Sequence, residues 1–352
     1  MKPVLFIIER PTPQRAPVLN ELHNRGVAIH VVYVHGDAAE QGWGNVRLDH
    51  PHEFADGSRE TRATTIASRI RHGAYSALVS MGYRGSLRAS ALTAARLTRL
   101  PIAMRFDTNQ LQIEASDIYR RFARRTSMRF LIPRSATAWA IGSQNERFWR
   151  EEVGLRTIVS IPYEVPVLPG DVDAYSFSRV RNSDPKRLRF LYVGRLTSIK
   201  MVDDAIAAFM NTHHPGWSLR IVGSGPDEQR LRRQAANDTR ISFVGSQTYS
   251  ELGAHFEQSD VLVLPSAGEP WGLVVNEALG YALRVIASDQ VGAAYDLVTP
   301  ENGEVYPVGD IGAMTRALDR CQVHLKQVSR PPATNTADLM QADLERLTRT
   351  RP

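Results

Sequence analysis

The sequence predicts an α/β protein with two domains of parallel strands and connecting helices. Short apolar runs, such as residues 4–8 and 261–264, alternate with segments of helical composition, such as residues 86–99, and this alternation is typical of βαβ units. The chain has 352 residues, of which 43% are hydrophobic, so each of two domains can form a sizeable core. A stretch rich in proline, glycine and polar residues separates the two halves and is expected to link them.

The expected elements give the domain boundaries. Residues 1–166 form an N-terminal domain, residues 167–187 a linker and residues 188–328 a C-terminal domain, and residues 329–352 form a connector and a last helix that can cross back to the N-terminal domain. In the N-terminal domain we expect strands at residues 4–8, 27–34, 77–80, 101–106 and 136–142, with a further short strand near 46–48. In the C-terminal domain we expect strands at residues 188–193, 219–222, 241–244, 261–264 and 286–289.

Composition and charge exclude several classes of protein. The single cysteine, Cys321, excludes an internal disulfide and a metal site built from several thiolates, and the ten histidines form no His-Glu-x-x-His pattern, so no metal is expected. The apolar run at 4–8 is too short for a signal peptide or a membrane span and predicts a first strand in a cytoplasmic protein. A formal net charge of +6 favours an anionic partner, namely a phosphorylated ligand, an anionic membrane or a nucleic acid. Because no recognition helix or aromatic platform is present, nucleic acid is not expected.

Two glutamates mark residues 261–289, the most informative stretch of the chain. A buried strand is followed there by a loop and then a helix, so the loop lies at the carboxyl end of a parallel strand, where open α/β sheets bind ligands. Glu269 lies in the loop and Glu277 lies in the helix eight residues later, so both can face one elongated ligand. From the spacing alone, a capping role for Glu269 and a solvated position for Glu277 explain the pattern equally well. The first amides of this helix suit a phosphate, and they belong to Trp271, Gly272, Leu273 and Val274.

Other loops that follow strands of the same domain carry glycine and basic residues. Gly194, Arg195 and Lys200 follow the strand at 188–193, and an arginine fork with a lysine charge suits a diphosphate, although ordinary surface residues would give the same pattern. Gly223 and Gly225 follow the next strand, and they lack the third glycine of a dinucleotide fingerprint. Gly245, after the strand at 241–244, fits either a turn that faces a nucleotide base or a simple tight turn.

The stretch with the two glutamates resembles the Glu-x7-Glu signature of family 4 glycosyltransferases. The matching residues are Pro265, Ser266, Glu269, Gly272, Leu273, Val274, Glu277 and Ala278. The loop with Gly194, Arg195 and Lys200 and the turn with Gly223 and Gly225 also fit the family pattern. The chain departs from it at Ala282 and Arg284, where the family usually places glycine and proline before a strand, so the start of that strand is the doubtful point.

The resemblance implies a GT-B fold of two Rossmann-like domains with the active site in the interdomain cleft. It implies a retaining, metal-independent glycosyltransferase of hexosyltransferase type, with a nucleotide diphosphate-sugar as co-substrate and no further cofactor. On this reading Arg195 and Lys200 stabilise the departing diphosphate, Glu269 holds sugar hydroxyls and Glu277 holds the ribose. The acceptor would be a lipid-linked saccharide or another intermediate of cell-surface polysaccharides.

Asp107 is the candidate on the acceptor side. It follows the strand at 101–106 in the place where the family commonly has a histidine that faces the acceptor. An Asx turn or a cap for the following helix explains Asp107 equally well. Gln14 and Arg15 are further candidates, because the loop after the first strand approaches the donor's phosphates or the acceptor in the family, and a plain solvent turn is the simpler explanation.

Residues 116–134 form a basic amphipathic segment in which arginines alternate with aromatic and aliphatic residues. Such a segment can lie on an anionic bilayer at the inner face of the cell membrane. Its predicted contact residues are Arg120, Arg121, Phe122, Arg124 and Arg125. An ordinary surface helix explains the same pattern, with its arginines in solvent and its apolar side chains packed on the core.

Two other functions fit part of the evidence. An epimerase that acts on a nucleotide-sugar would share the architecture and the donor site. A noncatalytic nucleotide-sugar-binding module would keep Glu277 but would lose Arg195 or Lys200, and this chain has both residues.

Overall fold

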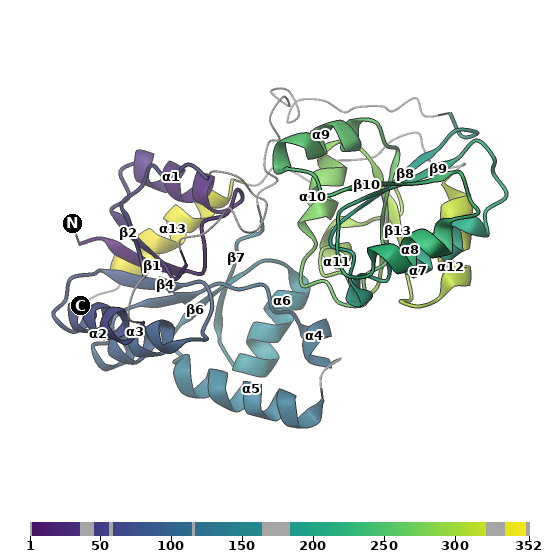
Figure 1. Cartoon of the computed structure of the whole chain (residues 1–352). Coiled ribbons are helices and arrows are strands. Elements are labelled where there is room, and N and C mark those ends of the chain that lie inside the picture. The colour runs from purple at the N-terminus through teal and green to yellow at the C-terminus, as the bar shows by residue number, and fades with distance from the viewer. Residues whose placement is uncertain are drawn as a thin grey trace. The chain divides into compact units, whose positions relative to one another are not determined.

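The chain folds into two compact α/β units (Figure 1). The computed structural model describes residues 2–35, 46–55, 59–114, 117–163, 184–321 and 335–349. Unit 1 comprises Met1–Glu164 and Thr334–Pro352, and unit 2 comprises Val165–Ala333. The last part of the chain therefore belongs to the same unit as the first.

Unit 1 contains a seven-stranded parallel sheet in the order β3-β2-β1-β4-β5-β6-β7. The strands are β1 (Val4–Ile8), β2 (Ile29–Tyr33), β3 (His52–Phe54), β4 (Ala77–Ser80), β5 (Ile102–Met104), β6 (Thr137–Ala140) and β7 (Thr157–Ser160). The helices are α1 (Ala16–Asn24), α2 (Arg59–Arg71), α3 (Ser86–Leu97), α4 (Gln110–Glu114), α5 (Ile118–Leu131), α6 (Ser143–Phe148), the π-helical turn η2 (Trp149–Val153) and α13 (Thr336–Arg349).

Helices cover both faces of this sheet. In β1, Phe6 and Ile8 pack into one core cluster with α1 and α13, whereas Leu5 and Ile7 pack into the other cluster with α2 and α3. This two-sided burial explains why β1 is a continuous apolar run instead of an alternating one.

Helix α13 is fastened to unit 1 by polar contacts as well as by its apolar face. The indole Nε1 of Trp139 in β6 donates to Oδ2 of Asp343 at 2.7 Å, and Thr336 Oγ1 donates to the carbonyl oxygen of Pro162 at 3.1 Å. Both Trp139 and Asp343 are buried, so α13 forms part of the core of unit 1.

Unit 2 contains a six-stranded parallel sheet in the order β10-β9-β8-β11-β12-β13. Its strands are β8 (Arg189–Val193), β9 (Ser218–Val222), β10 (Ile241–Gly245), β11 (Val261–Leu264), β12 (Arg284–Ser288) and β13 (Gly303–Tyr306). Its helices are η3 (Ser198–Lys200), α7 (Val202–Met210), α8 (Glu228–Ala235), α9 (Tyr249–Glu257), α10 (Leu273–Gly280), α11 (Ala294–Leu297) and α12 (Ile311–Arg320). From β8 the chain builds outward to β10 and then returns to place β11 on the other side of β8, so the strand order reverses between β8 and β11.

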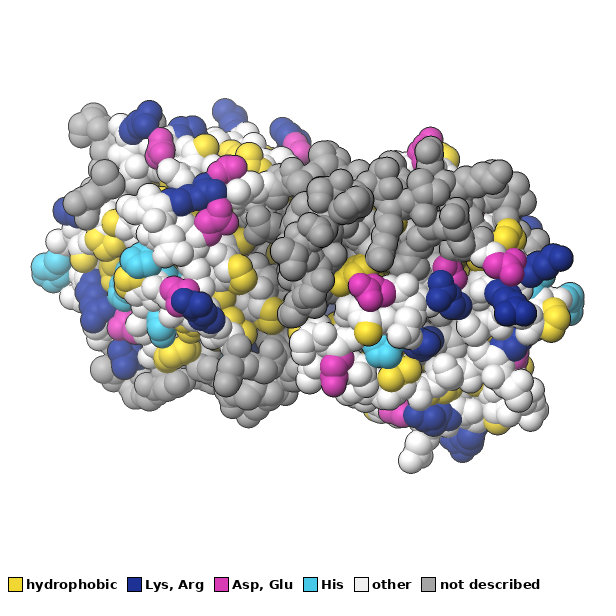
Figure 2. All heavy atoms as spheres, turned by 90° about the horizontal axis from the view of Figure 1, so that it is seen from above, with side chains coloured by type: hydrophobic (Ala, Val, Ile, Leu, Met, Phe, Trp, Pro, Cys, Tyr) yellow, Lys and Arg dark blue, Asp and Glu magenta, His cyan; other side chains and the backbone are white. Residues whose placement is uncertain are grey.

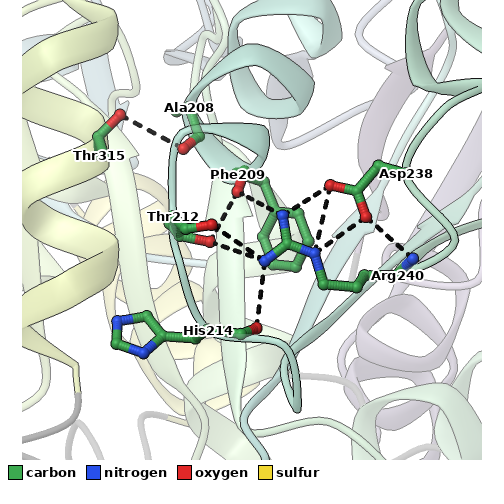
Figure 3. Close-up of polar contacts among 7 residues, drawn as sticks. All are labelled: Ala208, Phe209, Thr212, His214, Asp238, Arg240 and Thr315. Carbon is green, nitrogen blue, oxygen red and sulfur yellow. Dashed lines mark hydrogen bonds and ion pairs between the residues drawn. The ribbon is translucent and has the colours of Figure 1, made fainter.

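Arg240 organises the amino end of β10 (Figure 3). Its guanidinium donates to the carbonyl oxygens of Thr212 and His214, each at 3.1 Å, and pairs with Asp238 at 2.6 Å. It also lies over the ring of Phe209. Hydrogen bonding to Arg240 lowers the pKa of Asp238. Arg240 therefore ties the segment after α7 to the strand that follows Asp238, and His214 contributes its backbone to this structural network.

Some predicted elements differ from the structure. The expected strand near 46–48 is wrong, because the strand that pairs with β2 is β3, at His52–Phe54. Helix α12 ends at Arg320, and residues 322–334, which include the expected end of the C-terminal domain at residue 328, lie outside the described residues. Residues 167–183 of the expected linker also lie outside the described residues.

Strand β12 begins at Arg284 despite the departure from the family pattern. The buried Arg284 guanidinium donates to the carbonyl oxygens of Glu301 at 3.3 Å and Gly303 at 3.2 Å, so this arginine has a packing role. Ala282 adopts a left-handed conformation, with φ of 56°, in the position where the family has glycine. An alanine in this conformation is strained, because its Cβ crowds the backbone.

Ala282→Gly is therefore expected to stabilise the protein by about 1 kcal/mol, since glycine adopts positive φ without this strain. Urea unfolding followed by circular dichroism measures the change. The control is Ala254→Gly, at an exposed helical position of α9, where loss of helix propensity should destabilise the protein by about 1 kcal/mol. Equal destabilisation by both substitutions would show that position 282 is not strained.

Candidate functional site

The candidate site lies at the carboxyl edge of the unit 2 sheet, where the strand order reverses between β8 and β11. Ligands of open α/β sheets bind at such a reversal, because the loops from the two strands leave in opposite directions and open a crevice. The loop after β8 carries Gly194, Arg195 and Lys200, and the loop after β11 carries Glu269 and leads into α10. The predicted charged residues Arg195, Lys200 and Glu269 therefore lie in two loops that begin at neighbouring strands.

Lys200 and Glu269 join these two loops. The Lys200 ammonium donates to Oε2 of Glu269, and the two side chains are only 12% and 18% exposed. The backbone holds the same contact, since the amide of Ala267 donates to the carbonyl oxygen of Ile199 at 2.8 Å. A cation and an anion that are 69 residues apart in sequence are thus paired at the edge of the sheet.

The backbone fixes the position of Glu269 from the other side as well. Its amide donates to the carbonyl oxygen of Gln290 at 3.1 Å, and its carbonyl oxygen accepts from the amide of Gly292 at 3.0 Å. Gly272 follows with φ of 95°, and a Cβ at that position would lie 3.1 Å from Cγ of Glu269. Gly272, not Glu269, occupies the cap position of α10, so helix capping does not explain Glu269.

Glu277 lies inside α10 and is 6% exposed. Its carboxyl group has no hydrogen-bond or ion-pair partner within the part of the chain that the structure describes. Burial raises the pKa of Glu277 to about 7. A solvated helix position therefore does not explain Glu277, and a buried carboxyl without a partner is an energetically costly feature that calls for a reason.

The start of α10 is ordered by Trp271. The indole of Trp271 is buried and donates through Nε1 to Oδ1 of Asn276 at 2.8 Å. Leu273 and Val274 form the first turn of α10, and no side chain caps this helix. The first amides of the helix thus face the carboxyl edge of the sheet without a capping group, which is the arrangement that binds anions in other proteins.

The glycines after β8 and β9 allow these two loops to pack backbone against backbone. The amide of Gly194 donates to the carbonyl oxygen of Val222 at 3.0 Å. A Cβ on Gly223 would lie 1.9 Å from the carbonyl oxygen of Gly194, and a Cβ on Gly225 would lie 2.2 Å from that of Leu196. Gly245 accepts from the amide of Gly223 at 2.8 Å and has φ of 87°. The structure therefore gives these glycines a role in loop packing.

Three residues that the sequence analysis did not single out belong to the same edge. Tyr192, in β8, donates its hydroxyl to the carbonyl oxygen of Arg195 at 3.0 Å, and burial together with the charge of Glu269 raises its pKa. The hydroxyl oxygens of Thr197 and Ser266 are buried without a hydrogen-bond partner among the described residues. Tyr192 could not be predicted as a site residue, because an aromatic residue in a strand is usually a core residue. Thr197 and Ser266 could have been predicted, because they follow strands as the predicted site residues do.

Arg195 is exposed, and no ion pair of its guanidinium is found within the described ranges. Asp107 belongs to unit 1, where it follows β5 and is partly buried. It does not cap the neighbouring helices, because Asn109 accepts from the amide of Gln112 ahead of α4 and Asp117 accepts from that of Tyr119 ahead of α5.

The predicted membrane patch lies on α5, on the outside of unit 1 (Figure 1). Four large apolar side chains of α5, those of Ile118, Tyr119, Phe122 and Phe130, are between 71% and 81% exposed. Arg121 is turned inward instead, since its guanidinium pairs with the buried Glu152 of η2. Arg120 is exposed, and Arg124 and Arg125 are partly exposed.

Membrane-spanning helices and metal-binding clusters are both absent from the described residues. No helix among the described residues is long and apolar enough to cross a membrane. In the same part of the chain, no group of three or more histidine, cysteine, aspartate or glutamate side chains could hold a metal ion.

Comparison with known proteins agrees with the geometry of unit 2, because residues 175–322 match the family described as Glycosyl transferases group 1. The matched residues lie in unit 2, which carries the candidate site. The chain is 32% identical over 163 residues to a glycogen synthase of Mycobacterium tuberculosis, an alignment that covers 44% of this chain and 39% of the relative. The chain thus spans well under half of that protein's length.

Solved structures show the same fold over nearly the whole chain. A lipopolysaccharide outer core galactosyltransferase, WaaB, has a TM-score of 0.68 at 17% identity, with 98% of this chain and 95% of that chain covered. Anabaena HepE in complex with UDP-glucose has a TM-score of 0.70 at 15% identity, with 98% and 99% covered. Together with the two parallel α/β sheets, these likenesses confirm the predicted GT-B fold class. At such low identity they are evidence for the fold alone.

Proposed function

We propose that the protein is a retaining glycosyltransferase that takes a sugar from a nucleotide diphosphate-sugar bound at the carboxyl edge of unit 2. The observation that carries this proposal is the Lys200–Glu269 pair, which lies where the strand order reverses. Glu269 also lies in the loop that leads to the uncapped start of α10. Such a place combines a positive charge and helix amides for a diphosphate with a carboxylate for sugar hydroxyls.

The proposed chemistry consists of stabilising the charge that develops on the leaving diphosphate. When the bond between the sugar and the phosphate breaks, negative charge grows on the phosphate oxygens. Lys200, the exposed Arg195 and the first amides of α10 can face this charge, and fixed donors of this kind lower the barrier because they need not reorient. No residue is assigned as a covalent nucleophile, and no metal is assigned.

The two glutamates have different tasks in this proposal. The Glu269 carboxylate pairs with Lys200 in the free protein and accepts hydrogen bonds from sugar hydroxyls when the donor is bound. The buried Glu277 has no partner among the described residues, and the two hydroxyls of a ribose would supply donors to its carboxylate. The bound nucleotide thus supplies the hydrogen bonds that the buried Glu277 carboxylate otherwise lacks.

HepE has been solved in complex with UDP-glucose, and this supports a nucleotide-sugar as the first donor to test. A hexosyl donor and a saccharide acceptor, lipid-linked or otherwise destined for a cell-surface polysaccharide, are the proposed substrates, with Asp107 of unit 1 on the acceptor side. Incubation with UDP-glucose and with GDP-mannose, each with and without a saccharide acceptor, tests this. Product that grows with acceptor supports transfer, an epimerised donor without acceptor would indicate an epimerase, and an unchanged donor that binds would indicate a binding module.

We further propose that α5 holds the protein on the inner face of the cell membrane as a peripheral protein. Its exposed apolar side chains can enter the bilayer interface, and Arg120, Arg124 and Arg125 can meet anionic headgroups, each contributing about 1 kcal/mol near the surface. On the face of the molecule shown in Figure 2, by contrast, acidic and basic side chains are interspersed over both units.

Replacing Arg120, Arg124 and Arg125 with serine is expected to abolish sedimentation with anionic vesicles, while the wild-type protein sediments with anionic but not with zwitterionic vesicles. Binding should weaken as salt rises, because surface attraction decays over about 8 to 10 Å at physiological ionic strength. Arg121 stays unchanged because it pairs with Glu152.

Arg147→Ser with Arg150→Ser is the control, since both arginines are exposed on unit 1 outside α5. Wild-type protein that ignores anionic vesicles, or equal loss of binding in the control, would contradict the membrane role of α5.

A further inference from the structure

A second group of charged residues lies at the carboxyl edge of the unit 1 sheet. The strand order reverses there between β1 and β4, since β2 and β3 build outward on one side of β1 and β4 starts the other side. Glu9 follows β1, Gly82 follows β4, and Arg88 lies in the first turn of α3. This edge is the counterpart in unit 1 of the edge that carries the donor site in unit 2.

Arg88 is a buried arginine whose hydrogen bonds are incomplete. The residue is 5% exposed, and its Nη1 donates to the carbonyl oxygen of Arg84 at 3.2 Å and pairs with Oε2 of Glu9 at 2.7 Å. Its Nε and Nη2 are buried and have no hydrogen-bond partner among the described residues. A guanidinium carries five N–H donors, so three of them lack an acceptor. Leaving buried charged donors unpaired is costly, and a ligand that supplies acceptors is a reason to keep them.

A glycine and the start of a helix lie next to the Arg88 guanidinium. Gly82 lies beside the guanidinium, and a Cβ at this position would come within 3.3 Å of Nε of Arg88. The φ of Gly82 is 123°, which also favours glycine. The 12-residue helix α3 begins after Gly85 without a side-chain cap and has no acidic residue in its first turn. The first amides of α3 therefore add to the attraction for an anion beside Arg88.

Two more arginines strengthen the positive charge of this edge. Burial lowers the pKa of Arg15, but Tyr163, Asp107 and Glu9 together raise it by more, so the pKa lies above its ordinary value. Arg105 is buried and donates to the carbonyl oxygen of Ile161, and burial lowers its pKa to about 10. Among the described residues, Arg15, Arg88 and Arg105 thus share this edge with the carboxylates of Glu9 and Asp107.

We propose that the carboxyl edge of unit 1 binds an oxyanion group of the acceptor, a phosphoryl or carboxylate group, with Arg88 as its anchor. The planar fork of an arginine matches two oxygens of such a group. Glu9 pairs with Arg88 and lies 3.3 Å from His35 in the free protein, and its half-exposed side chain can turn to solvent when the oxyanion arrives. The inference rests on the proposed function, because it names the chemical class of the acceptor for that transferase.

Isothermal titration with glucose, glucose 6-phosphate and glucuronate tests this proposal. We expect at least one of the two charged sugars to bind about tenfold or more tightly than glucose. Arg88→Met should remove this preference, while Arg96→Met, an exposed arginine on the same helix, should keep it. The preference should also survive in Lys200→Met, which alters only the donor site. The charged sugar that binds more tightly decides between phosphoryl and carboxylate.

Glu9→Gln is a second variant that tests the proposal even if the Arg88→Met protein does not fold. Removing the competing carboxylate should strengthen binding of the charged sugar about tenfold and leave glucose binding unchanged. Equal binding of all three sugars to the wild-type protein, or a Glu9→Gln variant with unchanged affinity, would overturn the proposal. If the preference follows Arg88 but no nucleotide-sugar is turned over, the oxyanion site stands and the proposed transferase activity falls.

Discussion

Lys200→Met is expected to lower the turnover of the nucleotide-sugar by about 10² to 10³, the usual effect of removing one fixed donor from a developing oxyanion. The Lys200 ammonium is largely buried and lies against Glu269 at the edge of the unit 2 sheet. Methionine preserves the length and the apolar stem of the side chain but removes the charge. Initial rates of donor consumption at saturating donor measure the effect on the chemical step.

The control for this prediction is Lys186→Met, because Lys186 is an exposed lysine of the same unit that lies ahead of β8. Its turnover should remain close to that of the wild-type protein. Glu269→Gln, alone and combined with Lys200→Met, completes a double-mutant cycle that separates lost charge stabilisation from the effect of leaving Glu269 unpaired. Near-normal turnover in Lys200→Met would refute a role of this lysine in stabilising the leaving group.

Glu277→Gln is expected to make the free protein more stable at pH 8 and to weaken nucleotide binding at the same time. Burial raises the pKa of Glu277 from an ordinary value of 4.5 to about 7. The folded protein therefore holds a proton that the unfolded chain has already released between these two pH values. Stability falls as the pH rises through this window, and the ionised carboxylate costs on the order of 3 kcal/mol above it.

Glutamine carries no charge, so the Glu277→Gln variant should lose this decline in stability between about pH 4.5 and pH 7. Nucleotide affinity should fall about 10- to 100-fold, because hydrogen bonds from ribose hydroxyls to a carboxylate are stronger than those to an amide. Urea unfolding at several pH values and titration with nucleotide measure the two effects. Glu257→Gln, at an exposed position of α9, should change neither of them. An unchanged pH dependence in Glu277→Gln would show that burial of this carboxyl does not set the stability.

Much of the fold could be predicted because strands buried on both faces leave a clear apolar signal. Strands such as β1 and β11 are continuous apolar runs, and their predicted bounds agree with the structure. Strand β3 was missed because it has only three residues, is partly exposed and contains His52 and Glu53. Contacts that the sequence does not reveal support it, since Phe54 stacks on Tyr33 of β2 with the ring centroids 5.6 Å apart.

The sequence indicates which polar residues lie at the carboxyl edge of each sheet, but it does not indicate which of these side chains contact one another. Spacing places Glu269 and Lys200 after two strands, whereas their ion pair depends on β8 and β11 being neighbours in the sheet. The burial of Glu277 and the incomplete bonding of Arg88 also depend on tertiary packing. The inward turn of Arg121 toward Glu152 is a further case, because the sequence shows a basic helix face without its partner.

The most direct test of the central claim is an equilibrium binding measurement with a panel of nucleotide diphosphates and their sugars on the wild-type, Lys200→Met and Glu277→Gln proteins. A ligand that binds only the folded state raises its stability, by about 2.7 kcal/mol at a hundredfold excess over Kd, so thermal shift can screen the panel before titration. The account predicts that at least one nucleotide diphosphate binds the wild-type protein and that both substitutions weaken this binding. Absence of binding across the panel, or binding that neither substitution changes, would contradict a nucleotide-sugar site at the carboxyl edge of unit 2.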